Sequence, residues 1–322
     1  MKNEIFTAKN TFLKMWVLFI FILGNGLVSK AQSVSYKVVL DEPDKVNNIS
    51  CNLDLFHADG GIKQLSGFSL NTGLWGHAMY KHVGGIDYSI RHAWLTTGKI
   101  LNDKTPLRNS MYIQSGIFFI FHKKTKEIRA QVVMSSKTEY HGTYQTTYSK
   151  YIYANAHRMK YQALRGGIYF KRSVMKYEIP DPSGYGRKEI YTNYYIFGIY
   201  GGICFGRTLK LGILTDNFGE RGSAYHYRYI WDILITPIHN VPGNYGTINP
   251  IGGRFMVQII PSITRAERKK YGIGGARFPW EVEVGYRAVD GPYCAVSLSI
   301  PLFCRNLKVL GYQPTELVRT SE

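Results

Sequence analysis

Apolar and polar residues alternate along the segment from Phe278 to Phe303. The apolar positions are Trp280, Val282, Val284, Tyr286 and Ala288, followed by Cys294, Val296, Leu298, Ile300 and Leu302. The positions between them are Glu281, Glu283, Gly285 and Arg287, followed by Ala295, Ser297 and Ser299. This period of two residues is interrupted by a turn at Asp290-Gly291-Pro292. It predicts a β-hairpin with one apolar face and one polar or small face.

The same alternation recurs over the rest of the chain, and there is no convincing helical periodicity after the first thirty residues. Long alternating runs occupy 111–121, 193–206, 225–236, 279–289 and 293–303, with a shorter run at 164–170. Less regular candidates lie at 36–40, 51–57, 66–80, 83–95, 126–135, 142–153, 208–214 and 252–262. Gly206-Arg207-Thr208 is expected to be a short turn. The pattern predicts one all-β domain of about 12 strands, within a range of roughly 10–14.

Two antiparallel architectures fit such strands. A β-sandwich buries its apolar faces between two sheets, whereas a membrane β-barrel turns them outward to lipid and its polar faces toward the lumen. The long runs reach the ~9–11 residues of a membrane strand, beyond the ~5–6 residues of an average globular strand. Aromatic residues near the ends of these runs, such as Tyr195, Phe205 and Trp231, fit the aromatic girdles of such barrels. We therefore favour an antiparallel transmembrane β-barrel and keep the sandwich as an alternative.

The N-terminal segment has the order of residues found in a secretory signal peptide. Three lysines precede an apolar run from Met15 to Leu23, which is shorter than the ~20 residues that cross a bilayer. Small residues in Ser29-Lys30-Ala31 predict cleavage before Gln32; a retained membrane anchor is the alternative. We therefore expect a signal peptide at 1–31, a barrel at 32–303 and a C-terminal tail at 304–322.

The chain is strongly basic, with a formal net charge of +18. The leader holds four lysines and one glutamate, so the remainder carries +15. For an exported protein, this charge favours lipopolysaccharide and phospholipid headgroups as partners over nucleic acid. Basic clusters at 122–126 and 265–270 are expected in loops. The four cysteines, at 51, 204, 294 and 304, match no metal-site spacing.

The leader ending in Ala31-Gln32, the many tyrosines and glycines, and the final stretch VEVGYRAVDGPYCAVSLSIPLF resemble the outer-membrane β-barrel proteins of Bacteroidota. The resemblance covers most of the chain after the leader and rests on overall texture, with no diagnostic motif. It implies insertion into the outer membrane after export, with the barrel-assembly machinery as a partner during insertion. It implies no catalytic residue. One departure is that nineteen residues follow Phe303, whereas such barrels often end on an aromatic residue.

The polar face of the last hairpin gives the most specific expectation. If its apolar residues face lipid, its charged residues face the lumen, and the same holds for the polar residues of 225–236. The expected lumenal charge cluster is Glu281, Glu283, Arg287, Arg228 and Asp232. Two neighbouring glutamates in a dry lumen need a cation, which Arg287 or Arg228 would supply. Such a cluster plugs a narrow barrel or lines a small pore.

Signatures of enzymatic chemistry are weak. The Gly-x-Ser-x-Gly and His-Glu-x-x-His motifs are absent, and the glycines at 272–275 lack the rest of a phosphate-binding loop. His141, Ser149 and His157 are close in sequence and leave open a barrel enzyme acting on lipid A or phospholipid. We expect no catalytic residue, cofactor or metal.

The sequence thus favours a non-enzymatic outer-membrane β-barrel protein. Its expected role is a small pore, or a structural component of the envelope or of a secretion apparatus. The alternatives are a secreted β-sandwich that binds a surface ligand, and the lipid-directed barrel enzyme.

Overall fold

The computed structural model describes residues 35–43, 49–61, 68–80, 83–96, 110–141, 144–180, 186–241, 248–260 and 278–305. The strands are β1 (Tyr36–Asp41), β2 (Ile49–Gly61), β3 (Ser69–Tyr80), β4 (Gly84–Thr96), β5 (Met111–His141), β6 (Tyr144–Pro180), β7 (Arg187–Thr215), β8 (Gly219–Asn240), β9 (Ile251–Ile260), β10 (Trp280–Arg287) and β11 (Gly291–Arg305). Within these residues, no helix is long and apolar enough to span a membrane. The predicted signal peptide, the clusters at 265–270 and 272–275, and the tail from residue 306 onward lie outside the described residues.

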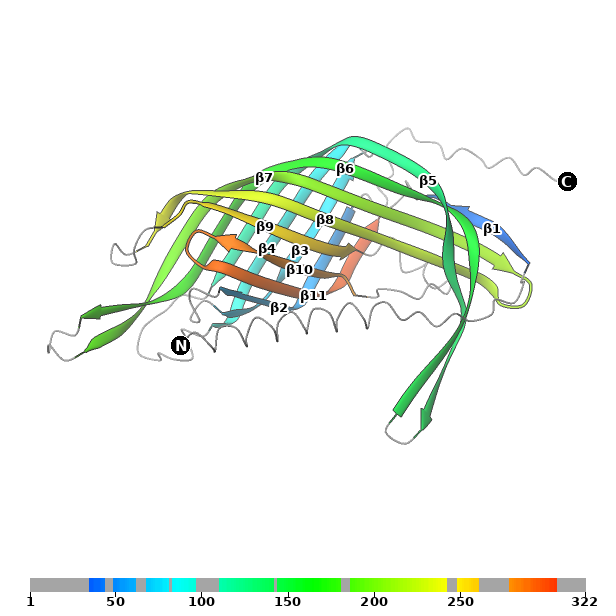
Figure 1. Cartoon of the computed structure of the whole chain (residues 1–322), viewed down its shortest axis with the longest axis horizontal. Helices are drawn as coiled ribbons and strands as arrows, with labels where there is room; N and C mark the ends of the chain where they lie inside the picture. The colour runs from blue at the N-terminus through cyan, green and yellow to red at the C-terminus, as the bar shows by residue number, and fades with distance from the viewer. Residues whose placement is uncertain are drawn as a thin grey trace, which may run out of the picture. The chain divides into compact units, whose positions relative to one another are not determined.

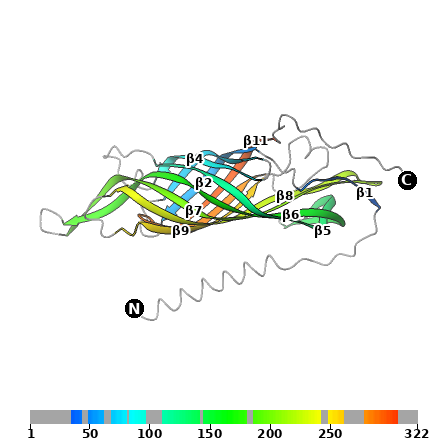
Figure 2. The ribbon, with the colours of Figure 1, turned by 90° about the horizontal axis from the view of Figure 1, so that it is seen from above.

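Ten of the strands form a closed antiparallel barrel (Figure 1 and Figure 2). From β2 to β11, each strand pairs with the next along the chain, and β11 pairs with β2 to close the ring. Phe303 lies in this closing strand, opposite Cys51. The predicted all-β antiparallel barrel is confirmed, and the two-sheet sandwich is not the fold. Ten barrel strands lie at the lower end of the predicted range.

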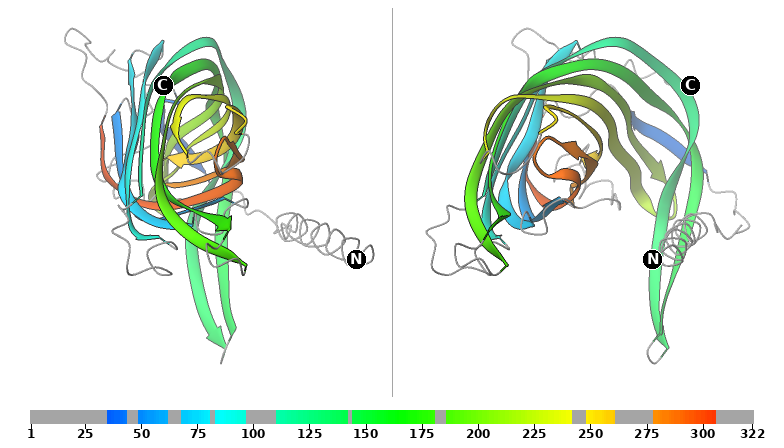
Figure 3. Two further views of the ribbon diagram at one scale, coloured as in Figure 1. Left: turned by 90° about the vertical axis from the view of Figure 1, so that its left-hand side faces the viewer. Right: turned by 60° about the vertical axis from the view of Figure 1, so that its left-hand side comes forward.

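Three strands are longer than the alternating runs indicated. β5 joins the runs 111–121 and 126–135, β6 joins 142–153 and 164–170, and β7 joins 193–206 and 208–214. Each of these three strands contains two of the predicted runs, so the sequence pattern overestimated the number of strands. Figure 3 shows the hairpin of β5 and β6 extending far beyond the barrel.

Two predicted connections are wrong because they lie inside these long strands. The basic cluster at 122–126 belongs to β5, where Lys124 pairs with Lys160. The predicted turn at 206–208 belongs to β7, where Gly206 pairs with Tyr161 on one side and Arg228 on the other. At 122–126, exposed polar residues on both faces of the strand end the alternation of hydrophobicity, but they leave the backbone pairing intact.

Side chains of the barrel strands alternate between exposed apolar and buried polar. On β10, Val284 is 43% exposed, whereas its neighbour Glu283 is 2% exposed. Each of the ten strands contributes exposed apolar side chains, and we call these together the apolar belt. Its members include Leu55, Leu74, Ile86, Ile90, Trp94, Ile117, Phe119, Leu164, Ile168, Ile199, Ile203, Trp231, Ile233, Ile251, Val284, Val296 and Leu298. The apolar face predicted for the last hairpin therefore points out of the barrel from Val282 to Tyr286 and from Cys294 to Leu302.

Glycines on the inner wall let large side chains fill the lumen. A Cβ added at Gly206 would lie 1.9 Å from the ring of Tyr161, and one at Gly198 would lie 2.5 Å from the ring of Tyr169. Both rings are buried. Each tyrosine ring therefore packs directly against the backbone at a glycine, because no side chain of the barrel wall lies between them.

β1 lies outside the ring and extends the sheet at the far end of β7. Strand β6 pairs with β7 only as far as Arg158, opposite Leu209, and beyond that point β1 takes its place, with Asp41 opposite Leu211. A clasp joins β1 to β6: the backbone N–H of His157 donates to Asp41 Oδ1 at 3.0 Å, and His157 Nδ1 lies 2.6 Å from Asp41 Oδ2.

This clasp is expected to weaken as pH rises. The hydrogen bond and charge of Asp41 raise the pKa of His157 above its ordinary value of 6.5. A raised pKa in the folded state means that the histidine stabilises the clasp below about pH 6.5 and loses this effect as pH rises through the raised pKa. Tryptic cleavage after Lys37 in β1 should therefore accelerate more between about pH 6 and pH 8 in the wild type than in His157→Gln. Identical acceleration in both proteins would show that the imidazole does not hold β1.

Candidate functional site

Among the described residues, thirteen buried charged side chains are connected by ion pairs inside the barrel. The six cations are Arg91, Arg165, Lys171, Arg228, Arg254 and Arg287, and the seven carboxylates are Asp54, Asp59, Asp87, Asp232, Glu281, Glu283 and Asp290. Each is at most 6% exposed. We call them the lumenal network. Because its charges nearly balance, the network carries none of the chain's positive excess.

One cluster of the network forms near the turn between β10 and β11. Arg287 Nη1 lies 2.8 Å from both carboxylate oxygens of Asp59, and its Nη2 lies 3.2 Å from Glu283. Lys171 Nζ bridges Asp59 at 3.1 Å and Asp290 at 2.5 Å. The phenol of Tyr194 donates to Asp290. The turn at 288–290 therefore places the carboxylate of Asp290 in the lumen, where it binds Lys171 and Tyr194.

Backbone geometry allows this inward turn. Gly291 has a φ of +68°, a left-handed conformation that glycine adopts without the steric cost of a Cβ. Ala288, which the sequence assigned to the apolar face, is buried in the turn. Tyr293 follows on β11, and the guanidinium of Arg287 lies 3.5 Å from the centre of its ring. The same phenol donates a hydrogen bond to Glu283.

A second cluster crosses the middle of the lumen. Arg228 binds Asp87 through two hydrogen bonds of 2.8 and 3.0 Å. Arg254 Nε donates to Asp232 at 2.7 Å. Arg165 lies between these pairs, 3.5 Å from a carboxylate oxygen of each acid. Two acids therefore share three cations. The bidentate geometry fixes the orientation of Arg228 relative to Asp87.

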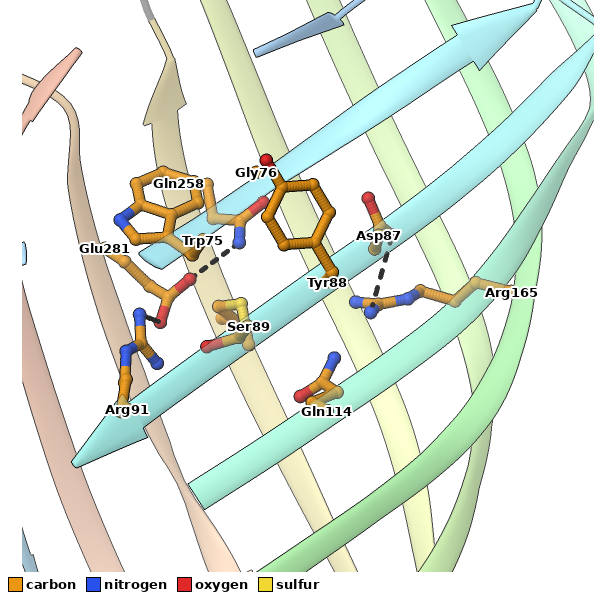
Figure 4. Close-up of a pocket in the computed structure, with 11 residues that line it drawn as sticks. Trp75, Gly76, Asp87, Tyr88, Ser89, Arg91, Gln114, Arg165, Gln258 and Glu281 are labelled. Atoms are coloured by element: carbon orange, nitrogen blue, oxygen red, sulfur yellow. Dashed lines mark hydrogen bonds and ion pairs between the residues drawn. The ribbon is translucent and has the colours of Figure 1, made fainter. Parts of the chain in front are cut away.

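A third cluster joins β4 to β10. Arg91 donates to Asp54 at 2.7 Å and to Glu281 at 3.0 Å, and Gln258 donates to Glu281 at 2.6 Å. Asp54 also accepts a 2.6 Å hydrogen bond from Ser299. Figure 4 shows Arg91, Glu281 and Gln258 on one side of a small cavity, with Asp87 and Arg165 on the other.

The structure places all five predicted cluster residues in the lumen but divides them among the three clusters. Glu283 and Arg287 are in contact, as expected. Glu281 is neutralised by Arg91, and Arg228 binds Asp87 away from both glutamates. Of the two arginines offered as counter-ions to the glutamates, Arg287 therefore takes this role for Glu283, and Arg228 pairs with Asp87.

Sequence reasoning missed most partners of these residues. Asp87 and Arg91 occupy alternate positions on β4, together with Ser89, so that their period of two was a usable signal. Asp59 and Asp290 carried no such signal, because Asp59 lies near the end of β2 and Asp290 lies in a turn. Lys171 lies within β6, just after the alternating run 164–170.

A small cavity lies within the lumenal network. The cavity lined by Arg91, Gln114, Arg165, Gln258 and Glu281 has a volume of about 20 Å³, measured as space open to the centre of a water molecule. That is room for about one water molecule. The charges of the lumenal network are bonded to other side chains, so the network is electrically almost neutral.

The residues considered for catalysis are not brought together. Ser149 and His157 lie on one face of the same strand, eight residues apart, which is roughly 26 Å at about 3.3 Å per residue. Ser149 Oγ contacts Ser136 and His157 contacts Asp41. Strand β5 ends at His141, opposite Tyr144. A different pair, Ser50 Oγ and His77 Nδ1, is 2.9 Å apart, but both side chains are buried.

Among the described residues, no group of three or more His, Cys, Asp or Glu side chains is placed to hold a metal ion. Cys51, Cys204 and Cys294 are free thiols. No protein-family model matches the chain, and no match is found among curated proteins or among solved structures.

Proposed function

We propose that this chain is a non-enzymatic, membrane-spanning β-barrel protein of the outer membrane, with a plugged lumen and a structural role in the envelope. The observation that carries the proposal is its inverted burial pattern. An apolar belt surrounds the barrel, while thirteen charged side chains are enclosed within it. Soluble proteins place these classes the other way round and rarely expose apolar patches beyond a few hundred Å².

Lipid accounts for both halves of the pattern. Hydrocarbon solvates the belt without the cost that water would impose, and ring closure pairs the backbone groups of every barrel strand. The enclosed charges neutralise each other, as Arg287 does for Asp59 and Glu283. An open pore would instead leave charged side chains exposed to water along its wall.

The long strands support a structural role. β5 to β8 continue beyond the level at which β4 ends its pairing with Phe119, and the residues just beyond the barrel on β5 are exposed on both faces. Polar strands of this kind are compatible with water or a protein surface. We propose that they carry contacts with other envelope components, while the belt anchors the protein.

The test uses single-tryptophan variants reconstituted into phosphatidylcholine vesicles with brominated acyl chains. Trp94 and Trp231 are 56% and 58% exposed on the belt, whereas Trp75 is 3% exposed and faces inward. Bromine atoms quench indoles that they approach closely. We therefore expect strong fluorescence quenching of the Trp94 and Trp231 proteins and much weaker quenching of the Trp75 protein.

Weak quenching at all three positions would contradict membrane insertion. Planar-bilayer recordings of the same preparations separate the plug from the pore. We expect no stable conductance steps, because the lumenal side chains are buried. A regular single-channel conductance would overturn the plugged state and favour the pore.

A further inference from the structure

A second, open groove lies on the outer face of the barrel across β6 to β9. It has a volume of about 390 Å³, measured as space open to the centre of a water molecule. Its lining includes Lys160, Arg207, Phe205, Tyr229, Trp231 and Phe255. This size lies within the range of roughly 300–1,000 Å³ typical of small-molecule sites.

Strand register orders the groove from charged to apolar. Lys160 is paired with Arg207 at one end. Phe205 is opposite Tyr229 two residues further along, and Trp231 is opposite Phe255 two residues beyond that. Successive rows are therefore about 6–7 Å apart. The last row belongs to the apolar belt, so the groove has a cationic end and an aromatic end that opens onto the belt.

Aromatic rings form one wall of the groove. Trp231 and Phe255 have ring centroids 4.7 Å apart. The guanidinium of Arg207 lies 5.7 Å from the centre of the Tyr229 ring, within the distance of a cation–π contact. Arg207 is thus held over the aromatic wall with its remaining donors free to face outward.

The cationic end concentrates like charges. Lys124, Lys160 and Arg207 are directly opposite one another on three adjacent strands, an arrangement that destabilises a sheet. The pKa of the exposed Lys160 ammonium is lowered, by Arg158 most and then by Arg207, because nearby positive charges disfavour another. A bound anion would relieve this repulsion.

We propose that this groove binds a lipid with an anionic, phosphate-bearing headgroup. The phosphate binds Lys160 and Arg207, and an acyl chain lies along Phe205, Trp231 and Phe255. The proposal rests on the membrane-spanning function. Free phosphate would use only the cationic end, whereas a lipid matches the order of charge, aromatic ring and belt along the whole groove.

The experiment compares two single-tryptophan proteins in phosphatidylcholine vesicles that contain a small fraction of brominated phosphatidic acid. Trp231 lies in the groove, whereas Trp94 lies on β4, elsewhere on the belt. Each basic residue increases the affinity for anionic lipid by about fivefold. We expect the brominated lipid to be enriched at Trp231 by roughly tenfold or more relative to Trp94.

The double variant Lys160→Gln/Arg207→Gln should reduce quenching of Trp231 to that of Trp94. Its matched control is Arg129→Gln/Lys150→Gln, which removes the same charge from exposed positions on the extended hairpin and should leave the enrichment unchanged. If the control also abolishes enrichment, the attraction comes from general charge and the groove proposal is wrong.

The remaining outcomes separate the two proposals. Equal quenching of both tryptophans by brominated phosphatidic acid, with normal quenching by brominated phosphatidylcholine, would overturn the groove and leave membrane insertion intact. No quenching by either lipid would overturn membrane insertion itself. Loss of the excess quenching on adding inorganic phosphate would show a general anion site and would overturn the choice of lipid.

Discussion

Replacing Arg287 with methionine is expected to lower the free energy of unfolding by about 3–5 kcal/mol, the range for breaking a buried ion pair on one side. Arg287 contacts Asp59, Glu283 and Asp290. Methionine has a similar length but no charge. The three buried carboxylates would therefore lose a counter-ion in a site where water cannot replace it. Denaturant titration of the protein in detergent micelles, followed by tryptophan fluorescence, measures the change.

Arg129→Met is the matched control. Arg129 lies on the extended part of β5 and is exposed, so its replacement is expected to change stability by less than about 0.5 kcal/mol. If Arg287→Met unfolds at the same denaturant concentration as this control, the lumenal network does not stabilise the barrel.

Val284→Lys is expected to destabilise the protein in lipid by about 2–4 kcal/mol, the cost of a cation near the midplane of a membrane barrel. Val284 faces outward on β10, between Phe255 of β9 and Cys294 of β11. Lysine there places an ammonium in the apolar belt. Unfolding in phospholipid vesicles measures the cost directly.

Tyr148→Lys controls for the loss of an exposed apolar side chain outside the belt. Tyr148 is 56% exposed near the tip of the β5–β6 hairpin, and the lysine variant should be nearly as stable as the wild type. Equal costs at both positions would show that the belt does not face lipid. Gly285 is unsuitable as a control, because a Cβ there would lie 2.3 Å from the carbonyl oxygen of Gly253.

The local pattern was sufficient to predict which way most hairpin side chains point, and Ala288 in the turn is an exception. A strand has a period of two residues, so Glu281, Glu283 and Arg287 had to share a face once Val284 was assigned to the other. The closed antiparallel barrel followed from many such runs. Membrane insertion, export and the resemblance to Bacteroidota barrels remain predictions.

Long-range pairing was not predictable from the same pattern. The partner of Glu281 is Arg91, 190 positions away, and nothing in either segment encodes that contact. The strand count failed for a related reason: polar residues such as Lys123 and Lys124 remove the alternation where a strand leaves the barrel. Asp290 was read only as a turn residue, because its inward direction depends on the conformation of the following glycine.

β1 and β2 each pair with a strand that lies far along the chain, and this limits the order in which the chain is able to fold. Asp41 pairs with Leu211, and Ile49 pairs with Arg305, so β1 must wait for β7 and one edge of β2 must wait for the last strand, β11. Contacts between such distant residues form slowly, because a large loop must close before any pairing compensates its entropy. Until then β2 keeps an unpaired edge, which is prone to aggregate with other chains. Newly made protein therefore needs protection from aggregation until its last strand is available, and loss of β11 would leave both β2 and β10 with open edges.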